Sequence, residues 1–272
     1  MEITGCLPSG RPRPKAFLFD FDGTISTLRH GWEGIMEPLM LEMICGSTPP
    51  GEALKREVGE YIDSSTGIQT IHQMQWLAQA VKRHGLNPGA SEDPWWYKAE
   101  YNRRLMIPVE RRRQSILSGE VPRSRFLVRG SAEFLAAIKR SGAAIYVASG
   151  TDQQDVMREA RALGVEGCFT EIAGALPGSM DCSKEAVLRR LMEVNFLRGP
   201  EIAVFGDGRV EIELGREAGA VTVGVASDEE KLCGVNPVKR KKLLGAGAHA
   251  IIGDFTQAQE IFSWLGLQDI RL

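Results

Sequence analysis

At residues 16–24 the chain reads AFLFDFDGT. The first part of this stretch is short, apolar and aromatic, as expected of a buried strand, and Gly23 marks the loop that follows it. Asp20 and Asp22 lie two residues apart at the end of the strand, where alternate residues of an extended chain project to the same side. Both carboxylates can therefore face one ligand.

Apolar runs alternate with helical patterns in the second half of the chain. Strands are expected at 143–148, 168–173, 202–205, 221–225 and 250–252, with helices near 132–139, 152–163, 183–194, 210–218 and 258–265. This alternation is typical of a parallel sheet with helices packed on it. We therefore predict an α/β fold, with a Rossmann-like parallel sheet core flanked by helices.

A long insertion interrupts this alternation. Between residues 26 and 125, apolar side chains such as Ile35, Met36 and Leu39 recur at helical spacing. We predict an all-α cap domain at 26–125, a core domain at 15–25 and 126–272, and a flexible tail at 1–14. Because the insertion leaves after the first strand and returns before the second, we expect it at the carboxyl ends of the sheet, where open α/β sheets bind ligands.

The bulk composition is that of a globular protein without a dominant charge. Lys and Arg total 33 against 35 Asp and Glu, and 43% of the 272 residues are hydrophobic. The balance gives no global attraction to nucleic acid or anionic lipid. No window approaches the ~20 apolar residues of a membrane span, and the five cysteines are scattered as reduced thiols would be. We expect a cytoplasmic protein that binds neither nucleic acid nor membrane.

Two carboxylates as close as Asp20 and Asp22 repel each other and a phosphate dianion. The arrangement therefore calls for a divalent cation and nearby basic groups, and Mg²⁺ is the hard cation that prefers oxygen ligands. With the cation present, Asp20 could attack phosphorus, while Asp22 could protonate the leaving oxygen and later activate water.

Two later segments offer positive groups or hydrogen-bond donors to a phosphate. The Ser149 hydroxyl and the backbone N–H groups around Gly150 and Thr151 precede a predicted helix, whose start can hold a phosphate oxygen. Lys184, at the start of another helix, could place its ammonium against both the phosphate and Asp20. Taken alone, the first segment also fits a helix cap, and the lysine also fits an exposed side chain.

A third segment offers oxygen ligands. Asp207 follows the predicted strand at 202–205 in a glycine-flanked loop, and Glu211 lies one helical turn later on the same face. The pair supplies two oxygen donors for a metal, although a glycine turn followed by an acidic residue at a helix start is an equally ordinary explanation.

In this order and spacing, the four motifs resemble the haloacid dehalogenase superfamily over about residues 15–265. The resemblance implies catalytic roles for Asp20 as nucleophile, Asp22 as acid/base, and Lys184. It implies phosphate binding by Thr24, Ser149, Gly150 and Lys184. It also implies Mg²⁺ binding by Asp20, Asp22 through its main-chain carbonyl, Asp207 and Glu211.

The resemblance also narrows the reaction. The superfamily's dehalogenases lack an acid at the position of Asp22, which disfavours dehalogenation, and the helical insertion is similar to the cap of the phosphoglycolate phosphatase and β-phosphoglucomutase branch. Two positions depart from the family pattern, namely Glu185, where proline is frequent, and Glu211, where aspartate is common. We expect a Mg²⁺-dependent phosphatase, monomeric or homodimeric, that acts on a small phosphorylated metabolite such as a sugar phosphate or phospho-acid; a phosphomutase or a non-catalytic regulatory protein are the alternatives.

Three features outside these motifs each admit two interpretations. Arg29 and His30 follow the catalytic loop and either reach the substrate or lie on the surface. The arginine run at 111–113 either binds a second anionic group or forms a solvated helix face. The aromatic run at 95–97 either stacks on a substrate or packs in the core of the insertion.

Overall fold

The computed structural model describes residues 1–8, 13–178 and 184–272, which form two compact units. One unit joins Met1–His30 to Arg112–Leu272, and the other spans Gly31–Arg111. The helical unit is thus narrower than the insertion at 26–125 that the sequence predicts. Its expected flanks pack with the sheet, because Ser26 forms an antiparallel bridge with Leu127 and the Thr27 N–H donates to the Phe126 carbonyl at 2.9 Å.

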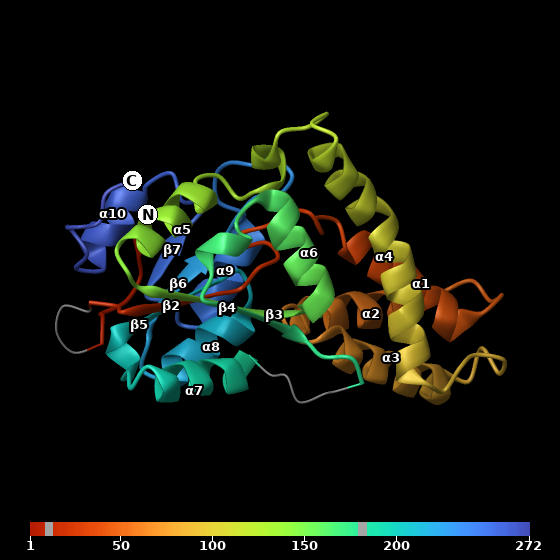
Figure 1. The fold of residues 1–272 in the computed structure, drawn as a ribbon. Coiled ribbons are helices and arrows are strands. Elements are labelled where there is room, and N and C mark those ends of the chain that lie inside the picture. Colours follow the sequence, from red (N-terminus) through yellow and green to blue (C-terminus); the bar gives the residue numbers. More distant parts are fainter. Residues whose placement is uncertain (9–12, 179–183) are drawn as a thin grey trace. The chain divides into compact units, whose positions relative to one another are not determined.

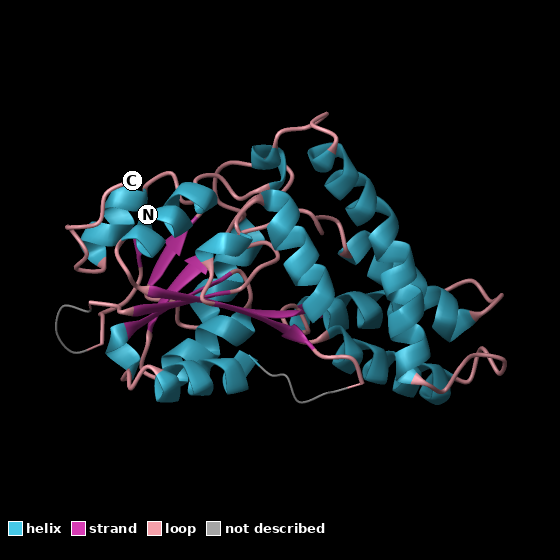
Figure 2. Cartoon of the chain, in the orientation of Figure 1, coloured by secondary structure: helices cyan, strands magenta, loops and turns pink. Residues whose placement is uncertain are grey.

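The first unit contains a seven-stranded sheet of order β1-β7-β6-β5-β2-β3-β4 (Figure 2). All neighbouring strands are parallel except β1 and β7, which pair antiparallel. The predicted α/β fold with a parallel sheet is therefore confirmed. The strands are β1 (Glu2–Ile3), β2 (Ala16–Phe19), β3 (Ala144–Asp152), β4 (Glu171–Ala175), β5 (Ile202–Gly206), β6 (Val221–Val225) and β7 (Ala250–Ile252).

Strand β2 is central and fully buried because both of its faces are apolar. Helices α5, α6 and α10 lie on one side of the sheet and α7 and α8 on the other (Figure 1). Phe17 and Phe19 pack in a core shared with the first group, whereas Ala16 and Leu18 pack in a core shared with the second. The helices of this unit are α5 (Ser131–Arg140), α6 (Gln153–Leu163), α7 (Lys184–Val194), α8 (Arg209–Glu217), α9 (Pro237–Gly245) and α10 (Ala258–Trp264), with 3-10 turns at Arg123–Phe126, Glu166–Cys168 and Gly199–Glu201.

The amino-terminal segment differs from the prediction of a flexible tail. Residues Glu2–Ile3 form strand β1, and the Thr4 N–H donates to the His249 carbonyl at 3.0 Å. The physical reason is that β7 would otherwise leave its backbone donors and acceptors unpaired at the edge of the sheet. A two-residue strand is too short to produce a periodic pattern in the sequence.

Two other boundaries also differ. Strand β4 begins at Glu171 rather than near 168, because Glu166–Cys168 form a 3-10 turn. Helix α9, which the pattern of apolar residues does not reveal, begins after Asn236, whose side chain accepts hydrogen bonds from the N–H groups of Val238 and Lys239. With Pro237 at its first position, this helix is specified by its cap rather than by an apolar face.

The second unit is helical throughout, as the spacing of its apolar residues predicts. It consists of α1 (Glu33–Cys45), α2 (Glu52–Ser64), α3 (Thr70–His84) and most of α4 (Pro94–Leu117) around its own core. Tyr97 is fully buried in that core, which favours packing over substrate stacking for this member of the 95–97 run. Within the described ranges, no helix combines the length and apolarity that a membrane crossing requires.

Truncation of Phe134 tests the aromatic core beneath β2. Its ring lies 4.6 Å from that of Phe262, 4.9 Å from that of Phe255 and 5.6 Å from that of Phe205, measured between centroids. We expect Phe134→Ala to lower the free energy of unfolding by roughly 3–5 kcal/mol in a urea titration followed by circular dichroism. Val194→Ala, at an exposed position, should change it by less than about 0.5 kcal/mol. Equal losses in both variants would contradict this assignment of the core.

Candidate functional site

The carboxyl ends of two neighbouring strands bring the first carboxylates together. Asp20 directly follows β2, and its N–H donates to the Phe205 carbonyl of β5 at 2.9 Å, which continues the ladder between the two strands. Asp207 directly follows β5. Because β2 and β5 are parallel and adjacent, Asp20 and Asp207 lie at the same edge of the sheet, as the sequence predicts.

Lys184, the first residue of α7, joins Asp20 to Glu211 of α8. Its Nζ lies 2.9 Å from Asp20 Oδ1 and also contacts Glu211 Oε1. All three side chains are less than a tenth exposed. The ammonium therefore offsets two buried carboxylates, and the predicted contact between Lys184 and Asp20 is present.

Asp207 has a basic partner that the sequence does not reveal. Lys239 Nζ, from α9, lies 2.7 Å from Asp207 Oδ2 and 2.6 Å from Glu229 Oε1. In the sequence, Lys239 begins the basic run KRKK, which is typical of an exposed helix. Its position in the site depends on the α9 cap and on a contact between residues 32 positions apart, and neither can be seen in a local pattern.

Gly23 permits the close approach of Asp207 to the loop after β2. A Cβ atom at position 23 would lie 2.1 Å from Asp207 Oδ2, and Gly23 has a φ of +73°. Both the space and the backbone conformation therefore require glycine.

The Thr151 hydroxyl donates its hydrogen bond to Asp22, so this donor is not free to bind a phosphate. Thr151 Oγ1 donates to Asp22 Oδ2 at 2.8 Å, and the Thr151 N–H donates to Ser149 Oγ at 3.1 Å. The strand predicted at 143–148 is longer in the structure, because β3 continues to Asp152 after a shift of register against β4. Gly174 of β4 makes this possible, since a Cβ there would lie 2.6 Å from the Thr151 carbonyl oxygen.

The other predicted phosphate-binding residues lie on the same two segments. Ser149 is buried in the extension of β3, and Gly150 follows it with partial exposure. Thr24, in the loop after β2, is fully buried, and its hydroxyl is among the few buried side-chain atoms of the described residues without a hydrogen-bond partner. The structure thus leaves the hydrogen-bonding capacity of this buried hydroxyl unused.

Burial raises the pKa values of both aspartates of the loop. The pKa of Asp20 rises to about 6 because desolvation outweighs the opposing effect of Lys184. The pKa of Asp22 rises to about 7 for the same reason, against the opposing effect of Arg29. A carboxyl group with a pKa near neutrality can both give and take a proton at physiological pH, which is the property that a general acid/base needs.

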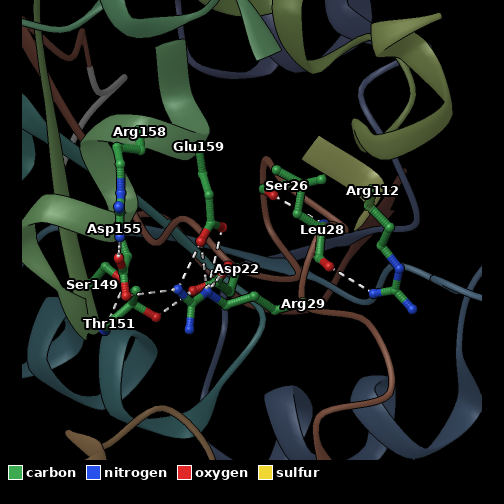
Figure 3. Close-up of polar contacts among 10 residues, drawn as sticks. All are labelled: Asp22, Ser26, Leu28, Arg29, Arg112, Ser149, Thr151, Asp155, Arg158 and Glu159. Carbon is green, nitrogen blue, oxygen red and sulfur yellow. Dashed lines mark hydrogen bonds and ion pairs between the residues drawn. The ribbon is translucent and has the colours of Figure 1, made fainter. Parts of the chain in front are cut away.

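Arg29 is a buried cation behind Asp22 (Figure 3). Its Nη2 and Nε donate to Glu159 Oε1 of α6 at 2.7 and 3.1 Å. Its Nη2 also lies 3.5 Å from Asp155 Oδ2, and its Nε lies 3.9 Å from Asp22 Oδ1. Of the two interpretations that the sequence allows, a surface position is therefore wrong. Arg29 thus links the loop that contains Asp22 to helix α6.

Arg112 holds the backbone on either side of Arg29. Its Nη1 donates to the carbonyls of Leu28 at 2.6 Å and His30 at 2.9 Å, and Figure 3 shows the first of these bonds. For Arg112, the member of the 111–113 run with these contacts, the structure thus indicates a role in fixing the main chain.

The predicted metal ligands fit Mg²⁺ in chemical kind. Asp20, Asp207 and Glu211 supply only oxygen donors, and Glu211 Oε2 and Asp22 Oδ1 are buried atoms without a hydrogen-bond partner. In the part of the chain that the structure describes, no three acidic, His or Cys side chains already form a cluster able to hold a metal. Instead, the ammonium groups of Lys184 and Lys239 contact the carboxylates.

Comparisons with known proteins agree with this architecture. A family model described as haloacid dehalogenase-like hydrolase matches residues 14–219. A search of curated protein sequences finds no significant match. Among solved structures, a β-phosphoglucomutase from Clostridium difficile is 17% identical and aligns with a TM-score of 0.64, covering 95% of this chain and 100% of that one.

Two further solved structures share the fold. A protein described as a predicted phosphoglycolate phosphatase, from Haemophilus somnus, is 17% identical with a TM-score of 0.60, covering 93% of this chain and 99% of that one. A hydrolase from Bacillus subtilis, solved bound to magnesium, is 14% identical with a TM-score of 0.56, covering 93% of this chain and 100% of that one.

Removal of the Arg29 charge tests its role as an anchor. We expect Arg29→Met to lower the free energy of unfolding by roughly 3–5 kcal/mol at pH 7, because Glu159, which is 1% exposed, would keep a buried charge without its main partner. The double variant Arg29→Met/Glu159→Leu removes both charges and should recover most of the loss. Chemical denaturation of the three proteins gives the comparison, and a single variant as stable as wild type would contradict the assignment.

Proposed function

Because the chain belongs to the haloacid dehalogenase-like hydrolase family, we propose that it is a Mg²⁺-dependent phosphatase that hydrolyses a small phosphorylated metabolite. The observation that carries the proposal is the pairing of a buried nucleophile with a buried cation, namely Asp20 with Lys184 at 2.9 Å, beside a second carboxyl group on Asp22. The names of the similar structures, a predicted phosphoglycolate phosphatase and a β-phosphoglucomutase, support phosphate transfer as the reaction class.

In the first step, Asp20 attacks the phosphorus of the substrate. An oxygen–phosphorus bond forms to Asp20, and the bond between phosphorus and the ester oxygen breaks. Asp22 gives its proton to the departing oxygen, which leaves as an alcohol. Thr151 Oγ1 donates to Asp22 Oδ2 at 2.8 Å and so fixes the carboxyl group that we propose gives the proton.

In the second step, the same groups act in reverse. The Asp22 carboxylate takes a proton from a water molecule, and the water oxygen attacks the phosphorus of the aspartyl phosphate on Asp20. The bond to Asp20 breaks, which releases inorganic phosphate and restores the nucleophile. Lys184, in contact with Asp20, offsets the charge that gathers on the phosphoryl oxygens in both steps.

A bound Mg²⁺ would neutralise part of the negative charge between the phosphate and the nucleophile. Asp20, Asp207 and Glu211, with the main-chain carbonyl of Asp22, are the groups that we propose hold it. The Thr24 hydroxyl, Ser149 and the backbone at Gly150 are the groups that we propose bind the phosphate oxygens.

The substitution Asp20→Asn tests the nucleophile. Phosphate release from a panel of sugar phosphates and phospho-acids should fall by more than roughly a thousandfold, because the amide cannot form the covalent intermediate. Asp269→Asn, at an exposed ion pair with Arg13, is the matched control and should retain wild-type activity. EDTA should abolish release by wild type, and added Mg²⁺ should restore it.

The same panel separates the alternatives. Turnover by Asp20→Asn at the wild-type rate would overturn the mechanism. Conversion of β-glucose 1-phosphate to its isomer without free phosphate would favour a phosphomutase, and inactivity of wild type on every compound would favour a regulatory protein.

The raised pKa of Asp22 predicts a loss of activity at alkaline pH. Asp22 must carry a proton when the substrate arrives, and with a pKa of about 7 it loses this form as the pH rises through 7. Asp20 must be ionised to attack, and a Mg²⁺ ion bound to its carboxylate would favour that form. We expect kcat/KM, measured at saturating Mg²⁺, to fall as the pH rises above about 7. A rate that climbs steadily from pH 7 to pH 9 would contradict the role of Asp22 as the acid.

A further inference from the structure

We propose that Lys239 is a positioning residue for the cation site: it holds one oxygen of Asp207 and so fixes the other for the metal. The inference rests on the proposed function, because it assumes that Asp207 binds Mg²⁺. It assigns a role to a residue of α9, a helix that carries none of the four sequence motifs.

The ammonium of Lys239 has three acceptors for its three N–H donors. Its Nζ lies 2.7 Å from Asp207 Oδ2, 2.6 Å from Glu229 Oε1 and 3.3 Å from Ser227 Oγ. A lysine ammonium has no further donor to offer. The group is therefore held in place by its partners, and no donor is left over for a substrate phosphate.

The partners of Lys239 connect it to the catalytic loop. Ser227 Oγ donates to the main-chain carbonyl of Gly23, which lies between Asp22 and Thr24. The backbone N–H of Lys239 is itself tied to the Asn236 side chain at the start of α9, at 3.1 Å. Both ends of the lysine side chain are therefore anchored.

Asp207 is held at its Oδ2 atom by both Lys239 and the Gly23 loop. Oδ2 accepts from Lys239 Nζ at 2.7 Å, and the same oxygen lies 2.1 Å from where a Cβ atom on Gly23 would stand. With Oδ2 held by Lys239, Oδ1 is the oxygen that stays available to a cation. Hydrogen bonds of this kind to a ligating carboxylate typically contribute 10–100-fold to metal affinity.

Glu229 offsets the repulsion between the Lys239 ammonium and a cation bound at Asp207. An isolated ammonium near Asp207 would repel Mg²⁺, but Glu229 lies as close to Lys239 as Asp207 does and supplies a compensating negative charge. The pair of Lys239 and Glu229 is neutral as a whole, so its orienting effect on Asp207 prevails over repulsion.

Calorimetric titration of the 272-residue protein with MgCl₂, without substrate, tests the proposal. We expect Lys239→Met to bind Mg²⁺ about tenfold or more weakly than wild type. Lys241→Met is the matched control, because it removes the same charge from an exposed position of the same helix and should leave the affinity unchanged. Lys239→Gln, a shorter neutral side chain, should shift the affinity in the same direction, and circular dichroism checks that each variant is folded.

The sign of the change decides the outcome. Tighter Mg²⁺ binding by folded Lys239→Met would mean that the lysine competes with the metal, and unchanged binding would mean that it serves only the packing of α9; either result overturns the inference while leaving the proposed function intact. Failure of wild type itself to bind Mg²⁺ would overturn both the metal-dependent function and the inference.

Discussion

Repulsion among buried carboxylates is the constraint on which the rest of this site depends. The carboxyl ends of β2, β5 and β6, with the helices that follow, gather five carboxylates that are buried or partly buried, at Asp20, Asp22, Asp207, Glu211 and Glu229. Buried carboxylates of this density are tolerated only if cations lie among them. Lys184, Lys239 and Arg29 supply those cations from three different segments, so charge compensation also fixes α7, α9 and α6 against the sheet.

The sequence predicts the parts of this arrangement that follow from local pattern. The run before Asp20 is apolar on both faces, so its identity as a central strand follows directly, and Glu211 falls one helical turn after Asp207. The contact of Lys184 with Asp20 is predicted because Lys184 starts a helix and because the order and spacing of the four motifs resemble those of a known family. In each case, the signal lies within a few residues of the functional group.

What the sequence does not reveal depends on contacts between distant segments. Thr151 lies beyond the strand predicted at 143–148, yet β3 continues past it, because Gly174 of β4 leaves space for the longer strand. The sequence allows Arg29 either to contact the substrate or to lie on the surface, whereas α6 places Glu159 beside it, 130 positions later. Both are long-range effects, and hydrophobic periodicity carries no information about them.

The short strand β1 has a practical consequence for production of the protein. It covers β7, whose residues Ala250–Ile252 are apolar and would otherwise present an open backbone edge that invites pairing with a second chain. A bulky fusion partner or a truncation at the amino terminus would compete with this cover and promote aggregation of recombinant material.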